Sequence, residues 1–228
     1  MKRLAIITAR GGSKRIPRKN IKSFCSKPIL AYSIEAALQS ECFDEVMVST
    51  DDAEIAQIAI EYGAIVPFYR SDETANDFAT TNDVILEVIS EYEKLGKFFD
   101  TACCIYPTAP FVTAEKLSSA IELLESSDAD TLIPVVPFSY PPQRALIIEE
   151  NRLIFNQPQY LESRSQDLQK HYHDVGQFYC IKIDKYKVTQ KLMLGNIIPF
   201  ELNELEVQDI DNEIDWKLAE IKYELLHK

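Results

Sequence analysis

Short apolar runs alternate with segments of helical periodicity along the first 137 residues of the chain. The apolar runs predict buried strands at residues 3–9, 45–50, 64–69, 101–105 and 131–136. The segments between them predict helices at residues 28–38, 53–62, 82–95 and 113–124. Strands separated by helices of this length form a mostly parallel, Rossmann-like sheet with helices on both faces. The sequence therefore predicts an α/β fold.

The start of the first predicted helix carries two signals. Ser26 is expected to cap this helix, and Pro28 to lie near its first turn.

The pattern changes after residue 137, where prolines interrupt a polar, extended stretch. We interpret residues 138–174 as an insertion within a single domain that spans residues 1–228, with a hairpin formed by residues 146–149 and 153–155. A strand at 176–183 and a helix from about residue 212 follow. Ile214, Leu218, Ile221 and Leu225 are spaced four, three and four apart, which predicts a core-facing stripe on that helix. Trp216 and Tyr223 lie off this stripe.

The composition is that of a soluble globular protein, with 46% hydrophobic and 26% charged residues. No apolar run is long enough to span a membrane, so no membrane partner is expected. The five cysteines are odd in number and include no CxxC pair, which argues against a disulfide framework. The apolar run near the N-terminus is too short for a signal peptide. A cytoplasmic protein is therefore expected.

The charge is distributed unevenly. The net charge is −12, which disfavours nucleic acid as a partner. No acidic residue precedes Glu35, whereas this stretch holds nine basic ones: Lys2, Arg3, Arg10, Lys14, Arg15, Arg18, Lys19, Lys22 and Lys27. A cluster of cations directly after a buried strand indicates a site for a compact anion.

Residues 8–20 follow the first predicted strand and carry most of these cations. Gly11 and Gly12 allow a sharp turn whose N–H groups can approach an anion, and Ser13 adds a hydroxyl. The loop matches neither the P-loop pattern GxxxxGK[ST] nor the dinucleotide pattern GxGxxG. In sheets of this class ligands bind beyond the carboxyl ends of the strands, so residues 8–20, 49–52 and 106–110 are expected to converge there.

Asp209 and Asp211 are two residues apart before the last predicted helix. Magnesium prefers hard oxygen ligands and usually takes only one or two carboxylates beside phosphate oxygens. The pair therefore suits a magnesium ion that meets a triphosphate. The spacing equally fits an acidic start to the helix, which the helix dipole favours.

Several separated motifs share one resemblance. They are RGGSK at 10–14, IP at 16–17, KN at 19–20, VSTD at 48–51, PTAP at 107–110 and DID at 209–211. In this order and spacing they resemble the CMP-sialic acid synthetase (acylneuraminate cytidylyltransferase) family. Arg15 and the stretch YHDVGQFY at 172–179 look most like its pseudaminic acid cytidylyltransferase branch.

The resemblance implies a nucleotide-diphospho-sugar transferase fold and a nucleotidyltransferase that joins CMP from CTP to a nine-carbon acidic sugar. It implies Mg²⁺ on Asp209 and Asp211, with Arg10, Lys19 and Asp211 as catalytic residues. The implied nucleotide-binding residues are Ala9, Arg10, Gly11, Gly12, Ser13, Lys14, Lys19, Asn20, Arg70, Thr80 and Thr81. The family also uses its insertion to exchange arms between subunits, which implies a homodimer.

The sugar site departs from the sialic acid enzymes. Tyr106 stands where they commonly have a glutamine that contacts the sugar, which favours a pseudaminic acceptor. The candidate sugar-binding residues are Tyr106, Arg164, Gln166, His173, Asp174 and Gln177. Arg164 suits a bidentate pair with the sugar carboxylate, although its type is equally common as a plain surface residue.

Two other functions stay open at this point. One is a cytidylyltransferase for a different acceptor, such as N-acetylneuraminate, legionaminate or a Kdo-type sugar. The other is a noncatalytic nucleotide-binding module of the same fold, against which Arg10, Lys19, Asp209 and Asp211 argue.

Overall fold

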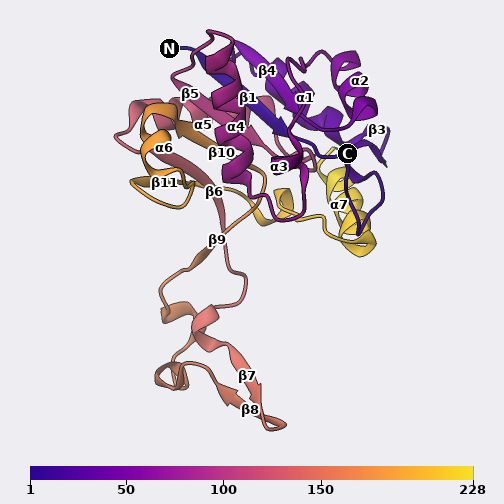
Figure 1. The fold of residues 1–228 in the computed structure, drawn as a ribbon. Helices are drawn as coiled ribbons and strands as arrows, with labels where there is room; N and C mark the ends of the chain where they lie inside the picture. Colours follow the sequence, from indigo (N-terminus) through magenta and orange to yellow (C-terminus); the bar gives the residue numbers. More distant parts are fainter. Residues whose placement is uncertain (228) are drawn as a thin grey trace.

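A single mixed sheet runs through the body of the molecule in the computed structural model, which describes residues 1–227 (Figure 1). Its main path has the order β11-β6-β10-β5-β1-β4, and β9 pairs with β6 beside this path. Strands β4, β1, β5, β6 and β11 point the same way, whereas β10 and β9 run antiparallel to their neighbours. The strands are β1 (Arg3–Thr8), β4 (Glu45–Ser49), β5 (Thr101–Ile105), β6 (Thr131–Pro137), β9 (Tyr172–Asp174), β10 (Phe178–Lys182) and β11 (Ile197–Glu201).

Helices cover both faces of this sheet, as the sequence predicted. Ala5 and Ile7 of β1 share one core cluster with α1 (Ile29–Gln39), α2 (Ala53–Glu61) and α5 (Ala114–Ser126). Leu4 and Ile6 point to the other face, in a cluster with α4 (Thr81–Lys94) and α6 (Ile183–Thr189). Successive side chains of a strand alternate between faces, so a continuous apolar run is what a sheet buried on both sides requires.

The predicted strand at 64–69 is wrong. This segment forms one isolated parallel bridge, between Met47 and Ile65. Pro67 lacks an N–H group for a ladder, and Ile65 and Tyr69 are 39% and 58% exposed. The segment therefore runs along the outer edge of β4, and it leads through Arg70 into the short helix α3 (Asp72–Ala75).

The expected cap at Ser26 is also wrong, because α1 has Pro28 at its N-cap position and no side-chain cap. Ser26 instead lies in the turn between the two short strands that precede the helix. These strands and the short 3-10 helices are β2 (Ser23–Phe24), β3 (Lys27–Pro28), η1 (Lys19–Ile21), η2 (Pro142–Arg144), η3 (Pro158–Tyr160), η4 (Ser165–Asp167) and η5 (Glu204–Glu206).

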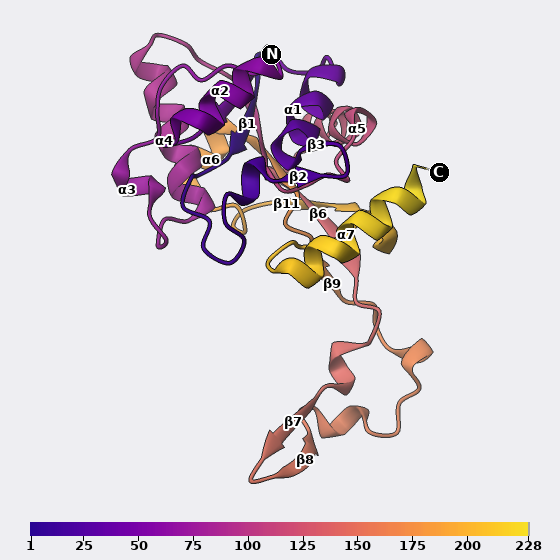
Figure 2. The same ribbon diagram turned by 90° about the vertical axis from the view of Figure 1, so that its right-hand side faces the viewer.

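Residues 138–171 form an arm that extends away from the body of the molecule (Figures 1 and 2). At its far end β7 (Leu146–Glu149) and β8 (Arg152–Phe155) form the predicted hairpin. Glu150 and Asn151 both have positive φ, of 48° and 63°, as a two-residue hairpin turn requires. The chain rejoins the main sheet at β9.

The final helix, α7 (Glu213–Leu226), buries a different face from the one predicted. Trp216 and Ala219 are 3% and 0% exposed, whereas Ile214 and Ile221 of the predicted stripe are 72% and 63% exposed. Trp216 packs edge-on against Phe24 at 5.6 Å between ring centroids. The aromatic cluster around Phe24 therefore decides the orientation of the helix. No helix within residues 1–227, α7 included, has the length and apolar character needed to cross a membrane.

The packing of α7 leads to a prediction about stability. Trp216→Ala should lower the free energy of unfolding by about 3–5 kcal/mol, because it removes a buried ring and leaves a cavity. Leu225→Ala, on the exposed stripe, should change it by less than about 0.5 kcal/mol. Urea unfolding of both variants measures the difference. A larger loss for Leu225→Ala would show that the predicted stripe, and not the tryptophan face, is buried.

Candidate functional site

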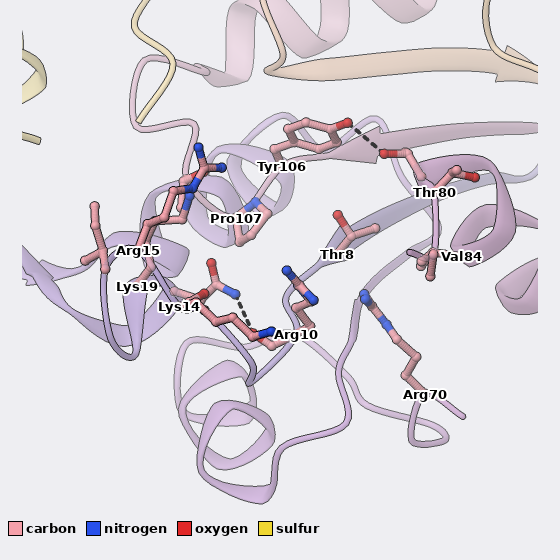
Figure 3. A pocket seen from close by; sticks show the side chains of 16 residues that line it. Thr8, Arg10, Lys14, Arg15, Lys19, Arg70, Thr80, Val84, Tyr106 and Pro107 are labelled. Carbon is pink, nitrogen blue, oxygen red and sulfur yellow. Dashed lines mark hydrogen bonds between the residues drawn. The ribbon is translucent and has the colours of Figure 1, made fainter. Parts of the chain in front are cut away.

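A cavity of about 250 Å³ lies beyond the carboxyl ends of β1 and β5, where the loops were expected to converge (Figure 3). Most of the predicted nucleotide-binding residues line it, namely Arg10, Ser13, Lys14, Lys19, Asn20, Arg70, Thr80 and Thr81. Ala9, Gly11 and Gly12 belong to the same turn but do not line the cavity. The sequence did not assign the remaining lining residues to the nucleotide: Thr8, Arg15, Ile16, Ala79, Val84, Tyr106, Pro107 and Thr108.

The turn after β1 is held by the end of β4. The Gly11 N–H donates to Oδ1 of Asp51 at 2.8 Å, and the Asn20 amide donates to the Arg10 carbonyl at 2.8 Å. A Cβ on Gly11 would lie 2.8 Å from Oδ2 of Asp52, so only glycine permits this approach. The close approach of Asp52 therefore explains why the turn has a glycine at position 11.

Asp52 joins this loop to helix α2. Its carboxylate accepts hydrogen bonds from the backbone N–H groups of Glu54 and Ile55, both at 3.0 Å, and thereby caps the helix. It also forms an ion pair with Arg18 of the loop. The Arg18 guanidinium, helped by the capping N–H groups, lowers the pKa of Asp52 to about 2.

Two cations of the cavity share one carboxylate from a distant part of the chain. Asp77 pairs with Arg10 at 2.7 Å and also with Lys14. Lys14 and Arg10 lower the pKa of the Asp77 carboxyl. Nothing in the sequence signalled this contact, because Asp77 is 67 residues from Arg10 and belongs to the loop before α4.

Arg70 is a buried cation of the cavity. It is 7% exposed, and its guanidinium donates to the carbonyl oxygen and Oγ of Ser49 at 2.8 and 3.0 Å. Burial lowers the pKa of Arg70. No carboxylate among residues 1–227 forms an ion pair with it. A buried guanidinium of this kind favours a bound group that offers oxygen or nitrogen acceptors.

Asp209 and Asp211 lie next to the same loop. The Lys19 ammonium donates to the Ile210 carbonyl between them at 2.7 Å, and Arg15 pairs with Asp211 at 2.7 Å. Burial, and then the neighbouring Asp211, raise the pKa of Asp209, while burial lowers the pKa of Lys19. Residues 1–227 contain no group of three or more His, Cys, Asp or Glu side chains arranged to hold a metal ion. Two carboxylates fit a Mg²⁺ ion whose other ligands come from phosphate and water.

A second cavity, of about 600 Å³, adjoins the first and shares Tyr106 with it. Tyr106 shares a hydrogen bond of 2.7 Å with Thr81 of the first cavity, which is the dashed line at the Tyr106 hydroxyl in Figure 3. Its ring packs edge-on against Tyr179, whose hydroxyl donates to Asp174 at 2.6 Å. His173, Asp174 and Asp209 also line this second cavity. Tyr179 and Lys222 also line it, although they were not among the sugar-binding residues predicted from the sequence.

Three of the predicted sugar-binding residues lie outside both cavities. Gln177 is 1% exposed, and its amide donates to the Glu206 carbonyl at 2.7 Å. Arg164 lies in the arm and pairs with Asp167 at 2.7 Å. Gln166 lines a separate cavity at the base of the arm. Within one chain, the structure therefore brings together Tyr106, His173 and Asp174 of the predicted set.

Known proteins identify the family. Residues 4–212 match the family model described as cytidylyltransferase. The chain belongs to the cytidylyltransferase family. It is 40% identical to a pseudaminic acid cytidylyltransferase of Campylobacter jejuni, over 100% of this chain and 99% of that protein. It is 34% identical to a CMP-N,N'-diacetyllegionaminic acid synthase of Legionella pneumophila, over 99% of this chain and 97% of that protein.

A solved structure shows the same fold. It is that of a CMP:2-keto-3-deoxy-manno-octonic acid synthetase complexed with CTP, with a TM-score of 0.72 and 18% identity. The match covers 100% of this chain and 99% of that one. The family inferred from the motifs is thus confirmed, and so is the α/β fold with a mostly parallel core.

The contacts of Asp52 predict a pH dependence of stability in this cytidylyltransferase. Asp52→Ala should lower the free energy of unfolding by about 1–2 kcal/mol at pH 7, because the cap and the ion pair are lost. The pKa of Asp52 is about 2 in the folded protein against an ordinary 3.8, so its ionised form stabilises the fold. This stabilisation is complete above about pH 4 and is lost as the pH falls toward 2.

Urea unfolding between pH 7 and pH 2 measures this effect as the difference between the wild-type protein and the variant. That difference should shrink below pH 4. Asp52→Asn is the matched control, since asparagine keeps the cap but does not titrate. A difference between wild type and Asp52→Ala that stays constant down to pH 2 contradicts the assignment.

Proposed function

We propose that this cytidylyltransferase transfers CMP from CTP to the anomeric hydroxyl of pseudaminic acid, a nine-carbon acidic sugar, and releases pyrophosphate. The observation that supports the proposal most is the arrangement of two adjoining cavities. One is lined by cations of the glycine turn, the other is larger, and Tyr106 and the Asp209–Asp211 segment lie where they meet.

The first cavity suits CTP. Arg10, Lys14 and Lys19 supply positive charge on several sides, as a triphosphate requires, and Ser13 adds a hydroxyl donor. Asn20 is assigned to the ribose end. Arg70, Thr80 and Thr81 are assigned to the cytosine end, because the buried guanidinium keeps N–H groups beyond its contacts with Ser49 for the acceptors of a base, and both threonines line the same cavity.

Asp209 and Asp211 are proposed to hold Mg²⁺ together with the phosphates of CTP. When bound, the ion supplies positive charge that polarises the α-phosphate. Lys19 fixes the backbone between the two carboxylates and so keeps both beside the phosphate loop.

The reaction follows from this placement. The anomeric oxygen attacks the α-phosphorus in line, a new P–O bond forms, the bond to the bridging oxygen of the β-phosphate breaks, and the hydroxyl proton is released. Arg10 and Lys19 stabilise the charge that develops on the phosphate oxygens and on pyrophosphate. Positioning and electrostatic stabilisation supply most of the acceleration in reactions of this kind.

The second cavity suits the sugar. Asp174, held by Tyr179 and by the Gly176 N–H, and His173 offer hydrogen bonds to hydroxyl and amide groups. Lys222 is a cation of this cavity, and its ammonium donates to the carbonyl oxygens of Val207 and Glu204 at 2.7 and 3.4 Å, which leaves one N–H group for a carboxylate. Tyr106 at the junction, and the 40% identity to a pseudaminic acid enzyme, favour pseudaminic acid over other nonulosonic acids.

A panel of acceptors and nucleotides tests the proposal. Pyrophosphate release should require CTP, with UTP, GTP and ATP at least about 100-fold less effective, and pseudaminic acid should be the best acceptor. A higher rate with N-acetylneuraminate or a legionaminic acid would reassign the sugar. Tight CTP binding without pyrophosphate release for any acceptor would identify a noncatalytic module.

Two lysine variants control this assay. Lys19→Ala should lower turnover at least about 100-fold, because it removes charge at the reacting phosphate. Lys217→Ala removes a lysine from the exposed side of α7 and should keep the wild-type rate. Equal rates for the two variants would remove Lys19 from the mechanism.

A homodimer is proposed from the arm. Leu146, Ile148 and Leu153 of its hairpin are 50%, 74% and 68% exposed, and an arm held away from the body does not bury them within one chain. A second copy of the chain, joined by exchange of the arms, would cover them.

Light scattering coupled to size-exclusion chromatography measures the mass of the particle. We expect a dimer at micromolar concentration and a monomer for the double variant Ile148→Glu/Leu153→Glu, because charges on the hairpin oppose burial. Val188→Glu places one such charge at an exposed site on α6 and should leave the dimer intact. A wild-type monomer would refute the proposed assembly.

A further inference from the structure

Arg15 forms a contact that the proposed function does not use. Its guanidinium pairs with Oδ1 of Asp211 at 2.7 Å, and it also lines the cavity assigned to CTP (Figure 3). The side chain of Arg15 is 69% exposed and that of Asp211 is 40% exposed. An ion pair this exposed is weak, so a competing charge can replace either partner.

The backbone around Asp211 is fixed, in contrast to this pair. On one side the Lys19 ammonium holds the Ile210 carbonyl at 2.7 Å. On the other side Oδ2 of Asp215 accepts hydrogen bonds from the N–H groups of Asp211 and Asn212, both at 3.0 Å. The main chain that carries the Asp211 carboxylate therefore stays in place while the partner cation of that carboxylate can change.

Two cations lie beside the pair of aspartates. Arg15 pairs with the Asp211 carboxylate, and the Lys19 ammonium lies against the Ile210 carbonyl between Asp209 and Asp211. Lys19 is half-buried and anchored to the backbone, whereas Arg15 is held only at its exposed tip. A divalent cation on the two aspartates can therefore displace Arg15, whereas Lys19 keeps its hydrogen bond to the Ile210 carbonyl.

We propose that Arg15 is the exchangeable counter-ion of the metal site. It neutralises Asp211 in the absence of substrate. When a divalent cation arrives with CTP, Arg15 leaves Asp211 and binds the triphosphate in the cavity that it already lines. The inference rests on the proposed function, since it needs metal and CTP to bind at these residues.

Two opposite effects of Arg15 follow. It competes with a metal ion that arrives alone, because the ion must displace the guanidinium without offering it a new partner. It favours the metal when CTP is present, because the displaced guanidinium gains a charge-assisted hydrogen bond to phosphate. Arg15 therefore increases the positive coupling between metal and nucleotide, and by linkage each ligand raises the affinity for the other equally.

Mn²⁺ serves as the probe, because its binding is read directly by electron paramagnetic resonance without turnover. The titration uses the full-length protein as wild type, Arg15→Gln, Arg15→Lys and Arg18→Gln, each with and without CTP. Arg18→Gln is the matched control: it removes the same charge from the same loop, but Arg18 pairs with Asp52 and Glu54.

Arg15→Gln should bind Mn²⁺ alone about three- to five-fold more tightly than the wild type, as expected for loss of an exposed competing ion pair. It should bind CTP in the presence of Mn²⁺ about ten-fold more weakly, as expected for loss of a charged hydrogen bond. Arg15→Lys should keep most of the wild-type behaviour, and Arg18→Gln should change neither affinity by more than about two-fold.

The proposal requires both changes in Arg15→Gln, tighter binding of Mn²⁺ alone and weaker binding of CTP in the presence of Mn²⁺. If Arg15→Gln leaves the affinity for Mn²⁺ alone unchanged or lowers it, or if Arg18→Gln reproduces the effect, the proposal is overturned. A wild-type protein that binds no Mn²⁺ together with CTP would instead overturn the proposed function itself, so the two failures are distinguishable.

Discussion

The structure depends on how a dense group of positive charges is held together after the first strand. Arg10, Lys14, Arg15, Arg18 and Lys19 lie within ten residues and would repel one another if unpaired. Each has a partner from elsewhere in the chain: Asp77 for Arg10 and Lys14, Asp52 for Arg18, Asp211 for Arg15, and the Ile210 carbonyl for Lys19. The loop is thus a cationic surface kept in place by carboxylates.

These pairs fall into two kinds, and the difference explains how the site can both fold and bind. Asp52 caps the start of α2 and does not line the cavity, so a ligand in the cavity leaves its pair with Arg18 unchanged. Asp77 and Asp211 pair with side chains that line the cavity, and those pairs are partly exposed. A triphosphate and its metal ion offer the same charges in a more concentrated form. The pairs of Asp77 and Asp211 are therefore the ones that a bound triphosphate and its metal ion can replace.

Much of this was predictable from the sequence, and the failures have physical causes. The glycines and cations directly after a buried strand predicted where the cavity lies, because parallel strands bring their carboxyl ends to one edge of the sheet. The predicted strand at 64–69 was wrong because Pro67 lacks an N–H group and the segment is exposed at the edge of the sheet, so it forms only one bridge to β4. The predicted core-facing stripe on α7 was wrong because the helix is oriented by Trp216, which packs against Phe24, and the spacing of apolar residues does not show such a contact. Asp77 was missed because an ion pair between distant segments leaves no local pattern.

The central claim is that the turn after β1 is where the triphosphate binds, by replacing the carboxylate partners of its cations. A crystal structure of the protein soaked with CTP and Mg²⁺ tests it most directly. The account predicts phosphate oxygens on Arg10, Lys14 and Lys19, a metal ion against Asp209 and Asp211, and Asp77 separated from Arg10. A triphosphate bound elsewhere, or an unchanged pair between Arg10 and Asp77 beside an empty glycine turn, would contradict it.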